Sequence, residues 1–215
     1  MVYCISDIHG EYDRYMAMLE KIQLSDSDTL YVIGDVIDRN PHGVEILLDI
    51  MQRDNVQMIL GNHEQMCIDD LHWHEWDARK LWQNNGGSCT RRELLYKRSA
   101  PERNRILQFL RDLPSCVDLE VNGRKFHLVH GYPNNEKYYR IWNRPDPKAP
   151  APIPGVTVVI GHTPTIYLID YQEEEEPYKI WHGDGLICID CGCGNETELR
   201  RLACLRLDDM AEFYV

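Results

Sequence analysis

The sequence lacks long apolar runs and a targeting segment at its start. Its apolar runs are short, far below the roughly 20 consecutive residues that a membrane-spanning helix needs. The first residues include the acidic Asp7 and Glu11 and no basic stretch, so we expect neither a secretory signal nor a transit peptide. We therefore expect a cytoplasmic protein that has no membrane partner.

A regular cysteine pattern is also missing. The eight cysteines are scattered, and a chain of 215 residues in a reducing compartment does not need disulfides, so we expect free thiols. Only Cys191 and Cys193 lie close together, with a single residue between them. Zinc sites normally have two intervening residues and a second such pair elsewhere, so we do not assign a metal to this pair.

Positive charge is scarce. Lys and Arg number 23 against 35 Asp and Glu, which gives a formal net charge of −12. This balance opposes general attraction to nucleic acid or anionic lipid, so nucleic acid is not an expected partner. An anionic substrate would need a locally positive site. Nothing in the sequence indicates an oligomeric state.

The composition is that of a globular protein, with 43% hydrophobic and 27% charged residues, and we expect one domain over residues 1–215. Between the first three of its short apolar runs lie stretches with helical spacing, which predicts a βαβαβ start and a sheet with parallel strands, hence an α/β fold. Six such runs rich in Val, Ile and Leu each end at a polar residue: 2–5, 30–33, 56–60, 126–129, 156–160 and 186–189.

Three further segments have a different character. Residues 65–115 lack strand patterns and carry helical spacing, so we expect a helical insertion there. Residues 143–155 are rich in proline, which predicts an extended loop. The acidic run 173–176 is expected to be a solvated loop or hairpin tip.

The chemistry is concentrated where the apolar runs end. In an open α/β sheet the carboxyl ends of the strands line a common crevice, so side chains that follow separate strands meet there. Carboxylate, imidazole and amide donors without thiolate suit Mn²⁺, Fe²⁺ or Zn²⁺, and so many donors predict a centre with two metal ions. The candidates are Asp7, His9, Asp35, Asn62, His63, His130 and His162.

Two arginines accompany these candidates. Arg39 follows Asp38 shortly after Asp35, and Arg144 begins the proline-rich loop. A guanidinium offers paired donors that match phosphate oxygens, so two arginines beside two cations would receive a phosphoryl group. This combination predicts hydrolysis of a phosphate ester. A Walker A pattern is absent, so the sequence does not support nucleotide hydrolysis of the P-loop kind.

Taken in order, these motifs resemble those of the PPP-type serine/threonine phosphatases within the calcineurin-like metallophosphoesterases. The similarity extends from Asp7 to Asp190 and is closest to the bacterial and phage branch, to which the bacteriophage lambda protein phosphatase belongs. The motifs that carry it are Asp7-Ile-His9-Gly10, Gly34-Asp35-Val-Ile-Asp38-Arg39, Gly61-Asn62-His63-Glu64, Asn85-Gly86-Gly87, His130-Gly131, Ile141-Trp142-Asn143-Arg144 and Gly161-His162-Thr163-Pro164.

The resemblance implies a central β-sandwich of mixed sheets flanked by helices, and two divalent ions, with Mn²⁺ expected and Fe or Zn as alternatives. Asp7 and His9 would bind the first ion, Asp35 would bridge, and Asn62, His130 and His162 would bind the second. His63 would be the general acid, oriented by Asp38. Arg39 and Arg144 would hold the phosphoryl oxygens while a metal-bridging water attacks in line.

The chain departs from the family pattern at two positions, where the family has glycine. Ser6 precedes Asp7 and is small enough to fit, with at most a slight shift of the first metal. Asn40 follows Arg39 and is expected to keep the turn, because Asn tolerates positive φ. Every ligand and both arginines are retained, so we expect an active enzyme.

Three functions are compatible with these residues. The leading hypothesis is a phosphatase of phosphoserine and phosphothreonine, with phosphotyrosine and small aryl phosphates as further substrates. The first alternative is hydrolysis of dinucleoside polyphosphates such as diadenosine tetraphosphate, in which Trp73, Trp76 or Trp82 would stack on the bases, although we expect these rings to pack within the helical insertion. The second is a docking module that binds metal without turnover, with His72, Trp73, His74 and Trp76 as a contact patch.

Overall fold

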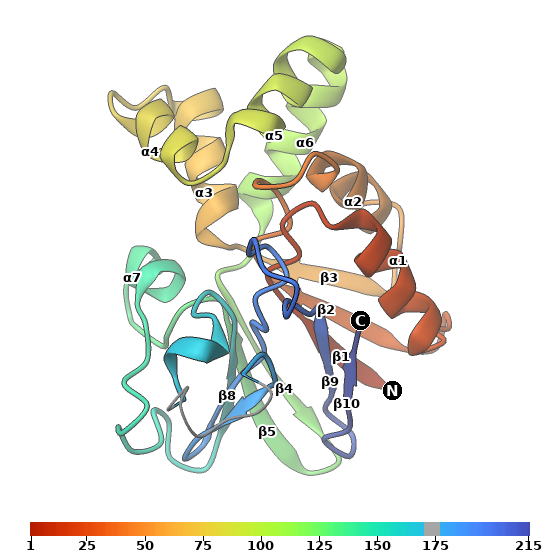
Figure 1. Ribbon diagram of the computed structural model, residues 1–215, viewed down its shortest axis with the longest axis vertical. Helices are drawn as coiled ribbons and strands as arrows, with labels where there is room; N and C mark the ends of the chain where they lie inside the picture. Colours follow the sequence, from red (N-terminus) through yellow and green to blue (C-terminus); the bar gives the residue numbers. More distant parts are fainter. Residues whose placement is uncertain (170–176) are drawn as a thin grey trace.

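Two mixed β-sheets packed against each other form the centre of the molecule, with helices around them (Figure 1). The structure is a computed structural model that describes residues 1–169 and 177–215. The acidic run 173–176, expected to be a loop, lies outside the described residues. The α/β fold class and the sandwich of mixed sheets are confirmed.

The first sheet contains the βαβαβ start. Strands β1, β2 and β3 run parallel, with Cys4 of β1 opposite Tyr31 of β2, and β9 and β10 extend the sheet antiparallel beyond β1. In sheet order the strands are β10 (Glu212–Tyr214), β9 (Ala203–Arg206), β1 (Val2–Ile5), β2 (Thr29–Ile33) and β3 (Val56–Ile59), and the crossover helices are α1 (Tyr12–Lys21) and α2 (Gly43–Ile50).

The second sheet repeats this mixture. Strands β5, β6 and β8 are parallel, while β4 and β7 pair antiparallel at the two edges. Two of its strands, β5 and β6, end where the sequence predicts polar site residues. In sheet order the strands are β4 (Cys116–Val121), β5 (Arg124–Val129), β6 (Thr157–Ile160), β8 (Leu186–Cys188) and β7 (Trp181–His182).

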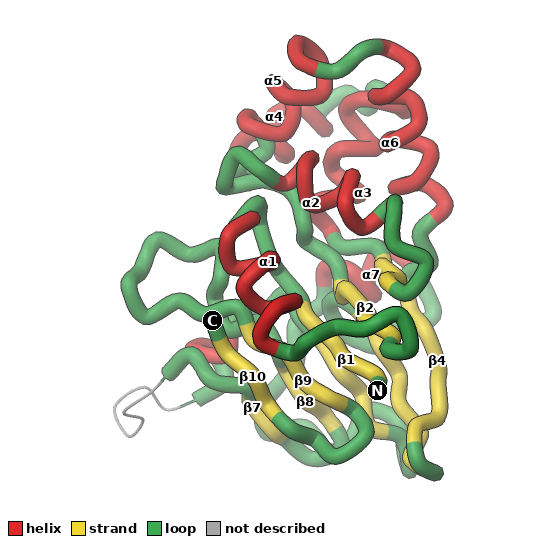
Figure 2. The backbone as a smooth tube through the Cα atoms, turned by 90° about the vertical axis from the view of Figure 1, so that its right-hand side faces the viewer, coloured by secondary structure: helices red, strands yellow, loops and turns green. Residues whose placement is uncertain are grey.

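One hydrophobic core lies between the sheets and a second lies beneath the crossover helices. Ile33 and Ile59 of the first sheet belong to the same buried cluster as Phe126 and Val159 of the second. Every residue of β2 and β6 after the first is buried, which explains their nearly continuous apolar sequences, whereas β3 and β5 also carry the exposed Gln57, Arg124 and Lys125. Helices α1 and α2 cover the outer face of the first sheet, as Figure 2 shows.

The segment expected to be a helical insertion contains four α-helices and two π-helical turns. They gather beyond the first sheet, in the upper part of Figure 1, and α3 begins directly after β3. Their bounds are α3 (Asn62–Ile68), a π-turn at Asp69–Trp73, α4 (Ala78–Asn84), α5 (Ser88–Arg92), a π-turn at Glu93–Lys97 and α6 (Ala100–Asp112).

Later in the chain, α7 (Lys137–Trp142) precedes the proline-rich residues 143–155, which contain neither helix nor strand, and a 3-10 helix spans Thr165–Tyr167. All eight cysteines are free, as expected. Among the described residues, no helix has the length and apolar character needed to cross a membrane.

The tryptophans of the helical insertion differ from the expectation that all three pack inside it. Trp82 is fully buried, but Trp73 is 58% exposed and Trp76 is 80% exposed. Trp73 instead lies under the guanidinium of Arg111, which is 5.6 Å from the ring centroid. The expectation is therefore wrong for Trp73 and Trp76.

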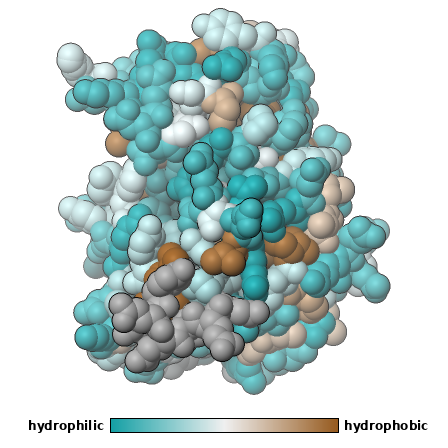
Figure 3. Space-filling model, viewed as in Figure 1, coloured by the Kyte–Doolittle hydropathy of each residue, from teal (hydrophilic) through white to brown (hydrophobic). Residues whose placement is uncertain are grey.

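The face of the molecule in Figure 3 is mostly hydrophilic, with hydrophobic side chains in small patches.

Candidate metal centre

The residues that follow the strands lie close together, although they come from five separate places in the chain. Asp7 and His9 follow β1, Asp35 follows β2, and Asn62 begins α3 directly after β3. The second sheet contributes two further imidazoles, because His130 follows β5 and His162 follows β6. All six side chains are at least 92% buried.

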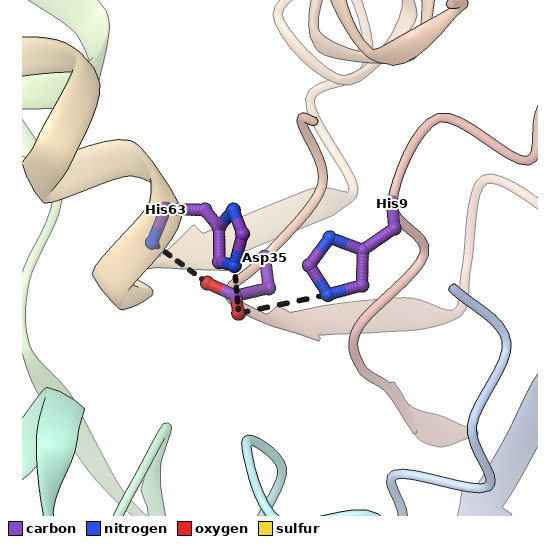
Figure 4. A group of neighbouring side chains, drawn as sticks. All are labelled: His9, Asp35 and His63. Atoms are coloured by element: carbon purple, nitrogen blue, oxygen red, sulfur yellow. Dashed lines mark hydrogen bonds and ion pairs between the residues drawn. The ribbon is translucent and has the colours of Figure 1, made fainter. Parts of the chain in front are cut away.

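Asp35 lies at the middle of this cluster. Its Oδ2 is 3.8 Å from His9 Nε2, 3.8 Å from His63 Nε2 and 3.3 Å from His130 Nε2, and Figure 4 shows the first two rings on either side of it. Its Oδ1 accepts a hydrogen bond from the backbone N–H of His63 at 3.0 Å. One carboxylate oxygen thus faces three imidazole nitrogens.

Two groups in the described residues have the spacing of metal ligands, and both include Asp35. One is Asp35 with His130 and His162, and the other is Asp35 with His9 and His63. Asp7 belongs to neither group, although its Oδ1 lies 4.0 Å from His9 Nε2. Asn62 Oδ1 lies 3.0 Å from His130 Nε2, beside the first group.

Backbone carbonyls orient three of the imidazoles. His9 Nδ1 lies 3.0 Å from the Ile37 carbonyl oxygen, and His130 Nδ1 lies 2.8 Å from that of Ile33. In His162 it is Nε2 that faces a carbonyl, at 3.1 Å from the oxygen of Trp142. A ring nitrogen that donates to a carbonyl leaves the other nitrogen with a free lone pair, which is the usual arrangement of metal-binding histidines. These donors therefore fit divalent cations.

The charges in the cluster also favour cations. Burial and the neighbouring Asp190 raise the pKa of Asp7 well above its ordinary value, and burial raises the pKa of Asp190 to about 6. Two buried carboxyl groups thus disfavour each other's ionisation. A cation between such groups would relieve this cost, because its charge favours both carboxylates.

Asp35 and the imidazoles polarise one another. Burial opposes ionisation of Asp35, but His130 and His63 hold the pKa of its carboxyl well below the ordinary value. Burial likewise opposes protonation of His130, but Asp35 raises the pKa of this imidazole to about 10. Burial, and then the charge of His130, lowers the pKa of His162 to about 3. The charge of each of these groups therefore shifts the pKa of its neighbours.

The turns that present these residues are strained. Asp7, His9, Asp35 and His162 have φ between 48° and 62°, a region that residues other than glycine rarely adopt. Strain of this kind is concentrated at functional sites, where the surrounding structure holds it in place.

The two departures from the family pattern are accommodated differently. Ser6 Oγ lies within hydrogen-bonding distance of the Asp7 carboxylate and of the Ile33 carbonyl oxygen, at 3.1 Å from the latter. Asn40 does not have the positive φ that was the reason for expecting it to keep the turn, because the positive φ angles fall on Asp38 at 74° and Arg39 at 64°. Asn40 stabilises the turn through its side chain, whose Nδ2 donates to the His9 carbonyl oxygen at 3.0 Å.

His63 differs from the other imidazoles because it faces a carboxylate as well as the cluster. Its Nδ1 lies 2.7 Å from Asp38 Oδ2, while its Nε2 faces Asp35. Burial lowers the pKa of His63, but Asp35 and Asp38 together raise it above the ordinary value. This is the arrangement expected of a proton donor.

Both arginines border the cluster. Arg39 is exposed. Burial is the largest cause of the lowered pKa of His9, followed by the charge of His63 and then by the charge of Arg39. The charge of Arg39 also lowers the pKa of Asp190, although burial raises that pKa by more. Arg144 is exposed and lowers the pKa of His162, after burial and His130. Two guanidinium groups thus stand on the solvent side of the buried donors.

A row of aromatic rings leads outward from the same place. The Trp142 ring packs edge-on against His162 with a centroid distance of 6.1 Å, and Tyr138 lies 6.1 Å from Trp142 at 31°. Tyr138 is 61% exposed and Tyr139, beside it, is 42% exposed. Helix α7 therefore presents aromatic rings next to the candidate metal centre.

Sequence reasoning did not assign a role to two residues that hold the site together. Glu64 is fully buried, and its carboxylate accepts hydrogen bonds from the backbone N–H groups of Asp35, Val36 and Gly61 at 2.9, 2.9 and 3.1 Å. Asn195 Oδ1 accepts a hydrogen bond from Arg39 Nη1 at 3.3 Å. The position of Glu64 directly after His63 was visible in the sequence, but the partner of Asn195 lies 156 residues away and left no signal.

Comparison with known proteins gives three findings. A family model described as calcineurin-like phosphoesterase matches residues 1–189. A symmetrical bis(5'-nucleosyl)-tetraphosphatase from Delftia acidovorans is 34% identical over 132 residues, which are 60% of this chain and 43% of that protein. Serine/threonine-protein phosphatase 2 from Salmonella typhimurium is 26% identical over 140 residues, which are 64% of this chain and 62% of that protein.

The fold has solved counterparts as well. The structure of a protein serine/threonine phosphatase from Saccharomyces cerevisiae matches with a TM-score of 0.65 at 14% sequence identity, over 100% of this chain and 78% of the other. The match to the Delftia protein covers less than half of that protein's length.

Proposed function

The chain belongs to the calcineurin-like phosphoesterase family, and from this premise we propose that it is a metal-dependent hydrolase of dinucleoside polyphosphates. The observation that carries the reaction is the single carboxylate oxygen of Asp35 that faces three imidazoles, with two arginines on the solvent side. The substrate class is supported by the tetraphosphatase relative and by the aromatic rings of α7.

Six residues would hold two divalent cations. Asp7 and His9 would bind one ion, Asn62, His130 and His162 the other, and Asp35 both. When bound, such cations neutralise phosphoryl charge and supply a nucleophile at neutral pH. Carboxylate, imidazole and amide donors suit Mn²⁺, which we propose as the native metal, and also Fe²⁺ or Zn²⁺.

The protein's own groups would position the substrate and move the proton. Arg39 and Arg144 would each bind oxygens of the phosphoryl group that is attacked, through paired guanidinium donors. His63 would give its Nε2 proton to the leaving oxygen as the bond from phosphorus breaks, while its Nδ1 remains hydrogen-bonded to Asp38.

The rings of α7 favour a nucleotide. A nucleobase stacked on an exposed aromatic ring gains about 1–3 kcal/mol without sequence selectivity. Tyr138 presents such a ring, and it is joined through Trp142 to His162 at the proposed centre. A base on Tyr138 would place its attached phosphates toward the cations.

A protein phosphatase of the bacterial and phage branch is the second candidate, and two observations favour it. The match to the Salmonella phosphatase covers larger shares of both chains than the match to the Delftia enzyme. The His63–Asp38 pair would also be of most use to an alkoxide leaving group, because serine and threonine hydroxyls are weaker acids than a nucleoside phosphate.

One assay separates the candidates. Metal-stripped protein would be resupplied with Mn²⁺ and given diadenosine tetraphosphate or peptides that contain phosphoserine, phosphothreonine or phosphotyrosine. We expect the highest kcat/KM for the dinucleotide. Preference for the peptides would establish the second candidate instead.

A third outcome concerns the docking alternative. If no substrate is turned over and the biological effect survives in His63→Asn and Arg39→Ala with their metal retained, the chain is a binding module. Loss of turnover in these two variants at unchanged metal content would exclude that alternative.

A further inference from the structure

A buried tryptophan of the helical insertion holds the carboxylate that orients His63. Trp82 lies in α4 and is fully buried, and its indole Nε1–H donates to Asp38 Oδ2 at 2.6 Å. His63 Nδ1 lies 2.7 Å from the same oxygen. The other oxygen of Asp38 is buried and has no hydrogen-bond partner. Because both donors meet at one oxygen, they fix the rotation of the carboxylate about the Cβ–Cγ bond of Asp38.

The backbone around Asp38 is held by the same part of the chain. Asp38 and Arg39 both have positive φ, at 74° and 64°, so this turn is strained. The N–H of Asp38 donates to Thr90 Oγ1 at 3.0 Å, and the N–H of Arg39 donates to the Gly86 carbonyl oxygen at 3.1 Å. The segment from Trp82 to Thr90 therefore supports both the backbone and the carboxylate of Asp38.

This contact gives a physical role to the Asn85-Gly86-Gly87 motif. A Cβ atom on Gly87 would overlap the indole ring of Trp82, so only glycine leaves room for the ring at its present position. Gly86 has φ of 93°, and a Cβ atom there would lie 3.1 Å from Arg39 Cγ. Both glycines thus permit the close approach of the helical insertion to the strained turn.

We propose that Trp82 is a positioning residue for proton donation by His63. Its indole N–H keeps Asp38 Oδ2 aimed at His63 Nδ1, and this contact directs Nε2 toward the leaving oxygen. The proton passes from Nε2 to that oxygen as its bond to phosphorus breaks, and a later exchange with water restores the imidazolium. The inference rests on the proposed function, because it assigns a supporting residue to that same reaction.

The leaving group distinguishes positioning from a structural role. A misplaced general acid slows substrates whose leaving group is a weak acid, but it spares those that leave readily without a proton. In Trp82→Phe, which removes the N–H but keeps a ring, we expect kcat for phenyl phosphate to fall about tenfold, within the range for losing an outer hydrogen-bond partner. The kcat for p-nitrophenyl phosphate should change little, and KM should be unaffected for both.

A matched control and a second measurement complete the test. Ile106→Val opens a small cavity at a fully buried position of α6 in the same helical insertion, so it reports instability alone. In the wild-type protein loaded with Zn²⁺, proton NMR should show one indole N–H that exchanges slowly with solvent and that shifts in Asp38→Asn. This second measurement does not depend on the folding of Trp82→Phe.

The outcomes are distinct. Loss confined to phenyl phosphate in Trp82→Phe, with metal content and the Ile106→Val rates unchanged, supports the inference. An equal fall in kcat on both substrates would overturn it. An indole N–H signal whose chemical shift is unchanged in Asp38→Asn would also overturn it. If the wild-type protein hydrolyses neither of these substrates nor diadenosine tetraphosphate, the proposed function fails, and the indole signal alone still decides whether Trp82 holds Asp38.

Discussion

The Asp35 carboxylate is the side chain on which the proposed centre depends most. Its Oδ2 faces three imidazoles, and it belongs to both groups of potential metal ligands in the described part of the chain. The fold holds the other oxygen of this carboxylate, because the backbone N–H of His63 donates to Oδ1. Removal of its charge should therefore affect both metals together.

We expect Asp35→Asn to lose bound metal and to lower kcat/KM by more than about 100-fold, the upper range for losing an outer partner of a metal ligand. Metal analysis of the purified variant and phosphate release in Mn²⁺ would check this. Asp118→Asn is the matched control, since the side chain of Asp118 is 81% exposed and pairs with His127. Full activity in Asp35→Asn would contradict the assignment.

Glu64 contributes to stability at the same place. It is fully buried and its carboxylate accepts hydrogen bonds from several backbone N–H groups, which a glutamine amide can satisfy only in part. Burial raises the pKa of Glu64 to about 7, so above this pH the group is charged, and loss of a hydrogen bond to a buried charged group costs about 1.5–3 kcal/mol. Urea unfolding of metal-free Glu64→Gln should show a loss of this size, whereas the exposed Glu20→Gln should remain near the wild type; equal stability of the two would contradict this role.

The closeness of the proposed ligands could be predicted at this scale because each follows an apolar run. Asp7, Asp35 and His130 come directly or shortly after strands, and parallel strands bring such residues together. The contacts of Trp82 with Asp38 and of Arg39 with Asn195 could not be predicted, since they join segments 44 and 156 residues apart. The positive φ of Asp38 and Arg39 was likewise invisible, because tertiary contacts impose it.

Helix α7 is the element that bears on the choice of substrate. Its Trp142 ring packs against His162 and its exposed Tyr138 ring lies 6.1 Å from the Trp142 ring, whereas the tryptophans considered for this purpose from the sequence lie in the helical insertion. The helix is short, and most of what it buries is the side chain of Ile141. Its conformation is fixed in part by the His162 ring, which bonds the Trp142 carbonyl.

We expect Tyr138→Ala to raise KM for diadenosine tetraphosphate about tenfold, because it removes one stacking contact worth about 1–3 kcal/mol. The KM for p-nitrophenyl phosphate should not change, since that substrate carries no base. Steady-state kinetics on both substrates would check this, with Tyr96→Ala as control for another exposed tyrosine, 78% exposed. An unchanged KM for the dinucleotide would contradict the stacking of a base on Tyr138.

Strands could be predicted from the sequence where most of their residues are buried. Strands β1, β2, β6 and β8 read as apolar runs because every residue after the first is buried, and β3 and β5 remained recognisable although each contains exposed residues. Strands β4, β7 and β10 escaped notice because they are sheet edges, short or alternating in burial, and β9 because it carries Arg206 within an apolar stretch. Their pairing is decided by the rest of the sheet rather than by their own sequence.

At the scale of the whole molecule, two sheets bring their strand ends to one place. Asp7, Asp35 and Asn62 come from the first sheet and His130 and His162 from the second, so the centre exists only when the sheets are packed together. The helical insertion covers the Asp38 side of this centre and α7 the His162 side. Because the chain has a net charge of −12, the proposed reaction would depend on cations and on Arg39 and Arg144 to receive an anionic substrate.

The most direct test of this account is a stepwise return of Mn²⁺ to metal-stripped protein, with bound metal and hydrolysis of p-nitrophenyl phosphate measured at each step. We predict that activity is absent without metal and that it becomes maximal only when two ions are bound per chain. Full hydrolysis in the presence of excess chelator, or maximal hydrolysis with a single ion bound, would contradict a two-metal centre built on Asp35.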